Sequence, residues 1–207
     1  MSRQLLVDCL PFEISATQIN ESLAKNDGRL VVKGILQRAE SKNQNGRIYP
    51  RATLMREAKK YSQTYIRERR ALGELDHPDS SVVNLQNASH NIMEMHWNND
   101  DLLGTVEVLG TPSGNILKEL FKSGIRLGIS SRGLGSVKEI HEEDGVETVK
   151  VQPDFELIAF DFVSNPSTQG AFMAPAAMNE GKDSKDAPQC KMYCKVEHII
   201  SDILTGE

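Results

Sequence analysis

The sequence contains few cysteines and no long apolar run, and each shortage argues against a class of protein. Three cysteines among 207 residues, Cys9, Cys190 and Cys194, are an odd number and too few for a disulfide framework, which favours a reducing compartment. No apolar run approaches the roughly 18 residues that a membrane-spanning helix needs, and the first residues lack the apolar stretch of a secretory signal. We therefore expect no membrane partner and no export from the compartment of synthesis.

Basic charge and aromatic side chains are also scarce. The chain has 24 Lys and Arg against 29 Asp and Glu, a formal net charge of −5, and only 5% aromatic residues. Contacts between basic side chains and phosphates supply most of the affinity for nucleic acids, and aromatic rings supply stacking, so we expect no nucleic-acid partner. At roughly 150 residues per domain, the length predicts one substantial domain and a tail.

The pattern of apolar residues predicts an α+β fold rich in antiparallel hairpins, with a closed or nearly closed sheet. We expect strands over 30–36 and 155–163, hairpins over 92–109 and 137–151, and helices over 51–70 and 111–123. After about Ala171 the composition turns to Ala, Pro and Met and then to polar residues without apolar periodicity. We therefore predict a domain over 1–175 and a flexible tail over 176–207.

The densest chemical signal is Gly-Ile-Ser-Ser-Arg-Gly-Leu-Gly at residues 128–135. Small neighbours would let a substrate backbone approach a serine hydroxyl, and glycines within a strand also indicate bulges or tight packing. A serine hydroxyl is a poor nucleophile unless a base accepts its proton. Of the five histidines, His77 is the best placed, because we expect it at a strand end beside Pro78 and three carboxylates.

The acidic residues near His77 allow a rival interpretation as a divalent metal site. Glu74, Asp76, His77 and Asp79 are all potential ligands, but alternation along a strand would keep the carboxylates from converging with the imidazole.

A second metal candidate, formed by Cys190, Cys194 and His198, has only one obvious third ligand, so two solvated thiols are the simpler interpretation.

Asp161 is the sole charge in the apolar run 157–163. A buried acid is costly unless it is paired, so we expect a partner for Asp161, and either a histidine or an arginine would serve. A histidine partner would make Asp161 the orienting acid of a catalytic triad.

Three segments together resemble the prohead core proteases of T-even-like tailed bacteriophages. They are Gly-Glu-Leu-Asp-His-Pro at 73–78, Gly-Ile-Ser-Ser-Arg-Gly-Leu-Gly-Ser at 128–136 and Asn-Gly-Arg-Ile-Tyr-Pro at 45–50. The resemblance covers about residues 30–170. It implies a serine endopeptidase similar in fold to the herpesvirus assemblins, with a mostly antiparallel β-barrel core surrounded by helices.

The resemblance also implies roles for individual residues. His77 would be the general base, Ser130 the nucleophile with Ser131 as the alternative, and Asp161 the acid that orients the imidazole. Only one of the two serines can meet His77, because neighbouring side chains on a strand face opposite sides. No cofactor and no metal are implied.

The family's cleavage after glutamate, in Leu or Ile-x-Glu sequences of scaffold and major capsid proteins, implies a basic substrate pocket. Arg132, Arg126 and Arg47 are the candidates for it. Met-Asn-Glu at 178–180 is a near match to the cleaved sequence, so we predict self-cleavage between Glu180 and Gly181. The implied location is the prohead core in the host cytoplasm.

Two other functions remain open at this stage. A catalytically inactive scaffold or structural head protein on the same fold would not need His77 and Ser130 together. A metal-dependent hydrolase would need a metal but not Ser130. The sequence also leaves open whether the chain forms homo-oligomers.

Overall fold

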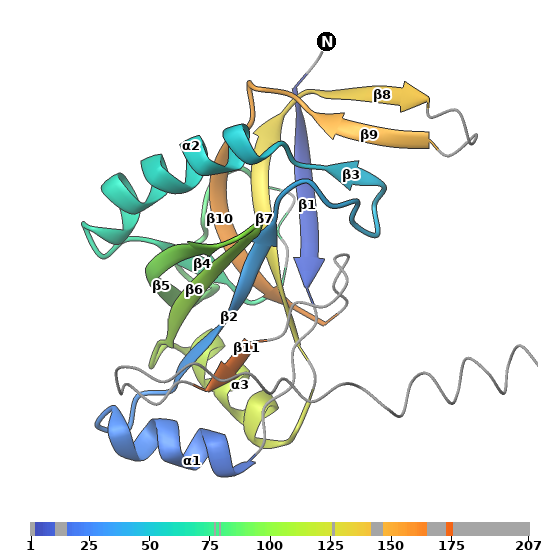
Figure 1. Cartoon of the computed structure of the whole chain (residues 1–207). Coiled ribbons are helices and arrows are strands. Elements are labelled where there is room, and N and C mark those ends of the chain that lie inside the picture. Colours follow the sequence, from blue (N-terminus) through green and yellow to red (C-terminus); the bar gives the residue numbers. More distant parts are fainter. Residues whose placement is uncertain are drawn as a thin grey trace, which may run out of the picture.

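The computed structural model describes residues 3–10, 16–76, 78, 80–125, 127–141, 147–164 and 173–175. Strands predominate over helices in this part of the chain (Figure 1). The strands are β1 Gln4–Leu10, β2 Val31–Arg38, β3 Arg47–Ile48, β4 Leu72–Glu74, β5 Ala88–Asn98, β6 Asp101–Val108, β7 Gly128–Gly135, β8 Val137–His141, β9 Glu147–Val151, β10 Glu156–Val163 and β11 Met173–Pro175. The helices are α1 Ala16–Lys25, α2 Arg51–Tyr61 and α3 Pro112–Lys122, and a π-helical turn, η1 Ser62–Ile66, extends α2.

The strands form three sheets. The first has the order β1-β7-β10, the second β11-β2-β6-β5-β4 and the third β3-β9-β8. Every ladder is antiparallel except the short pairing of β3 with β9. The α+β prediction is therefore confirmed.

The first and second sheets meet where β4 runs beside β10. An isolated parallel bridge pairs Leu75 with Phe162, and the backbone N–H of Asp76 donates to the carbonyl of Phe162 at 2.8 Å. We call this junction the seam. The described strands do not form the closed barrel that the sequence predicted, and likeness to the herpesvirus assemblins is not shown. A seam with so few backbone hydrogen bonds needs side chains to hold it.

Several predicted elements are confirmed because their apolar periods are strong. The hairpin predicted over 92–109 is β5 and β6, and Asn99 in its two-residue turn has the positive φ of 52° that such turns favour. The helix predicted over 111–123 is α3, in which Thr111 caps the N-terminus by accepting from the Gly114 N–H. The helix predicted to reach residue 70 is α-helical only to Tyr61.

Four other elements were not predicted. They are β1, α1, the two-residue β3 and the short β11, which pairs with β2 at residues 173–175, where the sequence indicated no periodicity.

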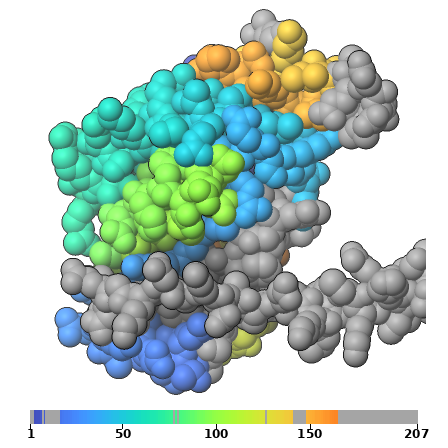
Figure 2. Space-filling model, viewed as in Figure 1, coloured from blue at the N-terminus to red at the C-terminus, as the bar shows by residue number. Residues whose placement is uncertain are grey.

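The helix α2 packs one face against the strands and also supports an irregularity in β10. Leu54, Ala58 and Tyr61 are buried on this face, as the amphipathic pattern predicted. Glu57 is buried beside them, and its Oε2 accepts the backbone N–H of Leu157 at 3.2 Å, where a bulge shifts the pairing of β10 with β7. On the face shown in Figure 2, α2 and the β5–β6 hairpin occupy much of the surface.

Gly73 in β4 lies close to β10 and to the imidazole of His90. A Cβ at this position would lie 1.9 Å from the Phe160 carbonyl oxygen and 2.2 Å from His90 Nε2, both far inside van der Waals contact. We predict that Gly73→Ala lowers the free energy of unfolding by about 3 kcal/mol or more, because a backbone carbonyl cannot move aside cheaply. Urea denaturation followed by circular dichroism measures this loss.

Gly110→Ala is the matched control, because a Cβ at Gly110 would meet nothing within 4 Å. We expect that variant to unfold within about 0.5 kcal/mol of the wild type. Equal unfolding midpoints for the two variants would contradict the close packing at Gly73.

Candidate active site

The two serines of β7 face opposite sides of the sheet and are both buried. Ser130 lies directly opposite Asp161 of β10, so these two side chains share a face. Ser131 lies opposite Phe160, and its Oγ accepts a hydrogen bond from Gln37 Nε2 at 2.8 Å. The structure therefore groups Ser130, but not Ser131, with the predicted acid.

Asp161 forms a bidentate ion pair with Arg132, which also lies on the Ser130 face. Arg132 Nε donates to Asp161 Oδ2 at 2.8 Å, and Arg132 Nη2 donates to Oδ1 at 3.1 Å. The two residues are diagonal neighbours across β7 and β10, a separation that a long arginine side chain spans. Of the two partners that the sequence left open for Asp161, the arginine is therefore present.

Glu74 of β4 completes this buried cluster from across the seam. Its backbone N–H donates to Asp161 Oδ1 at 2.9 Å, and its Oε1 accepts from Arg132 Nη2 at 3.0 Å. The same Oε1 accepts the backbone N–H of Asn84 at 3.0 Å, and Arg132 Nη1 donates to the Ser80 carbonyl at 2.6 Å. We call Arg132, Asp161 and Glu74 the arginine clamp.

The arginine clamp is fully enclosed. The side chains of all three residues have 0% of their surface exposed, so their attraction acts in a medium of low dielectric constant. Two carboxylates face one guanidinium, and Glu74 Oε2 is buried without a hydrogen-bond partner. Removing the guanidinium alone would leave two buried acids without their counter-ion, which is a costly state.

The three arginines predicted to bind a substrate glutamate lie in different surroundings. Arg132 is enclosed in the arginine clamp and offers no exposed charge. Arg47 donates to Asp8 Oδ1 at 3.3 Å, and Asp8 pairs with Ser131, so this contact lies on the face away from Ser130. Arg126 lies outside the described residues. Neither Arg132 nor Arg47 therefore presents an accessible positive charge beside Ser130.

Asp8 anchors the Asn-Gly-Arg-Ile-Tyr-Pro segment to β1, a role that the sequence analysis missed. Its carboxylate accepts from Asn45 Nδ2 at 2.8 Å and from the hydroxyl of Tyr49. Burial raises the pKa of Asp8, and the positive charge of Arg47 opposes that rise. The overlooked signal is the one that identified Asp161, a single acid in an apolar run, here residues 5–10.

His77 lies outside the described residues, but the chain on either side of it is described in part. The preceding residue, Asp76, has a φ of 70°, a left-handed conformation that is uncommon for a residue with a side chain. Its backbone N–H binds Phe162, the neighbour of Asp161, at the seam. The residues just before His77 therefore contact β10, the strand that pairs with β7 and carries Asp161 opposite Ser130.

His90 is a buried histidine with a structural environment. Its Nε2 donates to the Phe160 carbonyl at 2.8 Å, and its Nδ1 accepts from Ser89 Oγ at 2.8 Å, so both ring nitrogens are used. Burial lowers the pKa of His90 to about 4, although the negative charge of Asp161 opposes the shift. His90 is thus held neutral as part of the core.

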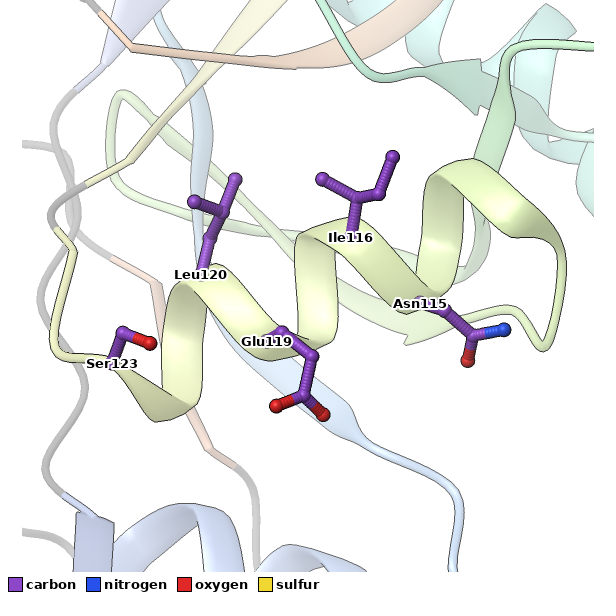
Figure 3. A pocket seen from close by; sticks show the side chains of 5 residues that line it. All are labelled: Asn115, Ile116, Glu119, Leu120 and Ser123. Carbon is purple, nitrogen blue, oxygen red and sulfur yellow. The ribbon is translucent and has the colours of Figure 1, made fainter.

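Other candidate sites receive little support from the described residues. Within them, no group of three or more His, Cys, Asp or Glu side chains could hold a metal ion, and Cys190, Cys194 and His198 lie outside them. An open hollow of about 410 Å³ lies along α3 and is lined by Asn115, Ile116, Glu119, Leu120 and Ser123 (Figure 3). It contains none of the predicted site residues.

The helices within the described ranges are too short or too polar for any of them to cross a membrane.

Comparison with known proteins defines first the class and then the family. Residues 7–183 match the family model described as prohead core protein serine protease, which places the chain in the class of peptidases. It belongs to the prohead core protein serine protease family.

The chain is 31% identical over 159 residues to the prohead core protein protease of Enterobacteria phage T4. This alignment covers 75% of this chain and 73% of that protein. The structure of the bacteriophage T4 capsid assembly protease superposes with a TM-score of 0.67 at 30% identity, covering 79% of this chain and 99% of that one.

The neutral state of His90 predicts a specific dependence of stability on pH. Because the pKa is lower in the folded protein than the ordinary 6.5, the unfolded chain binds the extra proton first, and stability is lost as pH falls from 6.5 towards 4. We predict that the wild type loses about 2 kcal/mol more than His90→Gln between pH 6.5 and 4.5. Urea unfolding at both pH values measures the difference.

The glutamine variant is the control, because its amide can still donate to Phe160 but does not titrate in this range. Acidic residues common to both proteins cancel in the comparison. Parallel losses of stability in wild type and variant would show that His90 accepts a proton while folded.

Proposed function

We propose that the chain is a serine endopeptidase that cleaves prohead scaffold and major capsid proteins after glutamate, in Leu or Ile-x-Glu sequences, during capsid maturation. The observation that carries the proposal is that Ser130 lies on the same face as Asp161, in the sheet that Leu75 and Asp76 contact at the seam. Membership of the prohead core protein serine protease family supports the reaction class.

In this proposal Ser130 Oγ attacks the carbonyl carbon of the scissile bond while His77 accepts its proton. Asp161 orients the imidazole and stabilises the imidazolium that forms. Collapse of the tetrahedral intermediate breaks the peptide bond, and His77 gives its proton to the leaving amine. Water, deprotonated by His77, then releases the acyl group from Ser130.

Ser131 is the weaker candidate for the nucleophile. Its hydroxyl is already bound by Gln37 on the face that carries Phe160, and Asp161 lies on the other face. An attack by Ser131 would need Gln37 to move and the general base to approach from the core. Ser130 lies instead on the face that carries Asp161.

The proposed preference for glutamate requires a cation near the bound substrate. Because Arg132 and Arg47 are both paired with buried carboxylates, Arg126 is the remaining member of the predicted set. We assign it the contact with the substrate glutamate. The proposed site of action is the prohead core in the host cytoplasm, with capsid and scaffold chains as partners.

The alternatives have less support. A metal-dependent hydrolase would use Glu74 as a ligand, but the buried Glu74 carboxylate is paired with the positive charge of Arg132, which would repel a cation. An inactive head protein on the same fold would not need a serine and a paired acid on one face of β7 and β10. Loss of activity in the single variant Ser130→Ala separates the protease from both.

We predict that a fluorophosphonate probe labels the wild type at Ser130 and that Ser130→Ala abolishes both labelling and cleavage of a Leu-x-Glu peptide. Ser131→Ala should keep activity within about tenfold of the wild type, because it removes only the hydrogen bond with Gln37. Peptide mapping by mass spectrometry locates the label. Full peptide cleavage by Ser130→Ala would refute the assignment, and survival of activity in chelator would separately exclude a metal-dependent reaction.

We also predict that the active protein cuts its own Glu180–Gly181 bond and loses residues 181–207, which lie outside the described residues. The intact mass of the purified protein, followed over time, measures this. Glu180→Gln should stay full length because it lacks the charge that Arg126 would bind, while the nearby control Asp183→Asn should be processed normally.

Adding active wild type to Ser130→Ala as a substrate separates a lack of activation from a lack of specificity. Cleavage of that inactive chain at any bond other than Glu180–Gly181 would overturn the predicted site. An active enzyme that leaves both chains intact would overturn self-cleavage itself.

A further inference from the structure

The seam between β4 and β10 carries few backbone hydrogen bonds, yet it joins the strand of Asp161 to the residues that precede His77 in the chain. Leu75 and Phe162 form one isolated bridge there, whereas β10 pairs with β7 along nearly its whole length. The position of β4 relative to Ser130 therefore depends on what fixes β4 against β10. Backbone pairing alone does this weakly.

Arg132 provides the missing connection. Its guanidinium reaches Asp161 on β10 through Nε and Nη2, Glu74 on β4 through Nη2, and the carbonyl of Ser80 beyond β4 through Nη1. One planar group thereby ties the strand of the nucleophile to the two elements on the other side of the seam. The Glu74 backbone N–H closes the ring by donating to Asp161.

The chemistry of this arrangement requires an arginine. Three of the four hydrogen bonds of Arg132 go to carboxylate oxygens, and their directions follow the rigid fork of a guanidinium. A lysine would keep the charge but concentrate it on one nitrogen, which cannot bind Asp161 through two parallel bonds. Charge alone is therefore insufficient to hold Asp161 in one orientation.

We infer that Arg132 and Glu74 are positioning residues that hold Asp161 of β10 and the nearby strand β4 in place relative to Ser130. We also infer that Arg132 does not bind the substrate. This inference rests on the proposed serine protease function. The Arg132 guanidinium faces two carboxylates and makes four hydrogen bonds to partners within the chain, so it is committed to the arginine clamp and not to a substrate side chain.

Arg132→Lys is the first test, with kcat and KM measured on two peptides that differ only in Leu-x-Glu against Leu-x-Gln. We expect kcat to fall at least about tenfold, because a small misplacement of the catalytic groups is expensive, while KM stays within about twofold. The preference for glutamate over glutamine should not change. The rate of fluorophosphonate labelling at Ser130 should fall together with kcat.

If Arg132 bound the substrate glutamate, the Arg132→Lys variant would give the opposite pattern. KM for the glutamate peptide would rise, the preference for glutamate would collapse, and labelling by the small probe would be unaffected. That result would overturn the inference. Arg126→Lys supplies the comparison, because we expect its effect to fall on KM for the glutamate peptide.

Glu74→Gln is the second test, and it stays informative if Arg132→Lys does not fold. The glutamine keeps an oxygen for Arg132 and Asn84 and replaces Oε2, which has no hydrogen-bond partner, so the shape of the side chain is preserved. We expect kcat and the labelling rate to fall about three- to tenfold with KM unchanged, because the guanidinium loses one of its two charged partners.

Glu57→Gln is the matched control for a purely structural effect. Glu57 is also a buried glutamate, it is paired with Arg56, and it contacts β10, but it lies outside the arginine clamp. We expect this variant to lower the unfolding temperature without changing kcat per folded molecule. Equal losses of kcat in Glu57→Gln and Glu74→Gln would overturn the inference.

These experiments distinguish a failure of the proposed function from a failure of the inference about Arg132 and Glu74. If the wild type is not labelled at Ser130, or if Ser130→Ala remains active, the proposed function is wrong and the inference falls with it. If the wild type is labelled at Ser130 but Arg132→Lys and Glu74→Gln keep the wild-type kcat, only the inference is wrong.

Discussion

The buried contact of one guanidinium with two carboxylates fixes the part of the molecule on which the proposed chemistry depends. Asp161 lies in an apolar strand, where a single charge is costly, and Arg132 makes that charge acceptable by binding both of its oxygens. Glu74 enters the same cluster from another sheet. The seam is thereby held by ionic contacts at a point where a single isolated bridge pairs the two strands.

The two faces of β7 carry side chains with different roles. Alternation along β7 and β10 puts Ser130, Arg132 and Asp161 on one face, while Phe160 and Phe162 project from the other. The phenylalanines pack edge-on against Tyr61, His90 and Phe121, so a well-packed aromatic layer supports the polar face from behind. This backing limits how far the clamp can shift, which suits residues that must hold a reactive geometry.

The sequence predicted the secondary-structure elements better than the contact partners of individual side chains. The β5–β6 and β8–β9 hairpins and the helix α3 follow from apolar periods and turn residues that act over short distances, whereas β1 and α1 were missed. The need of Asp161 for a partner was also predictable from its apolar strand. The identity of that partner was not, because Arg132 and Glu74 lie 29 and 87 residues away along the chain. The same arginine was assigned to the substrate, since its motif carries charge but no sign of burial.

A cluster with two acids and one base constrains substitutions as a group. Loss of Arg132 alone leaves Asp161 and Glu74 as buried like charges, linked through the Glu74 N–H to Asp161 Oδ1 contact, whereas loss of one acid leaves the other still paired. The effects of changes at these positions should therefore not add, because each residue shares its partner with another. Ser131 and Gln37 form a separate pair on the opposite face, so they can vary without disturbing the clamp. The Ser-Ser-Arg-Gly segment thus combines a proposed nucleophile, a core contact and an ionic anchor in consecutive residues, and only the pleat of the strand keeps these roles apart.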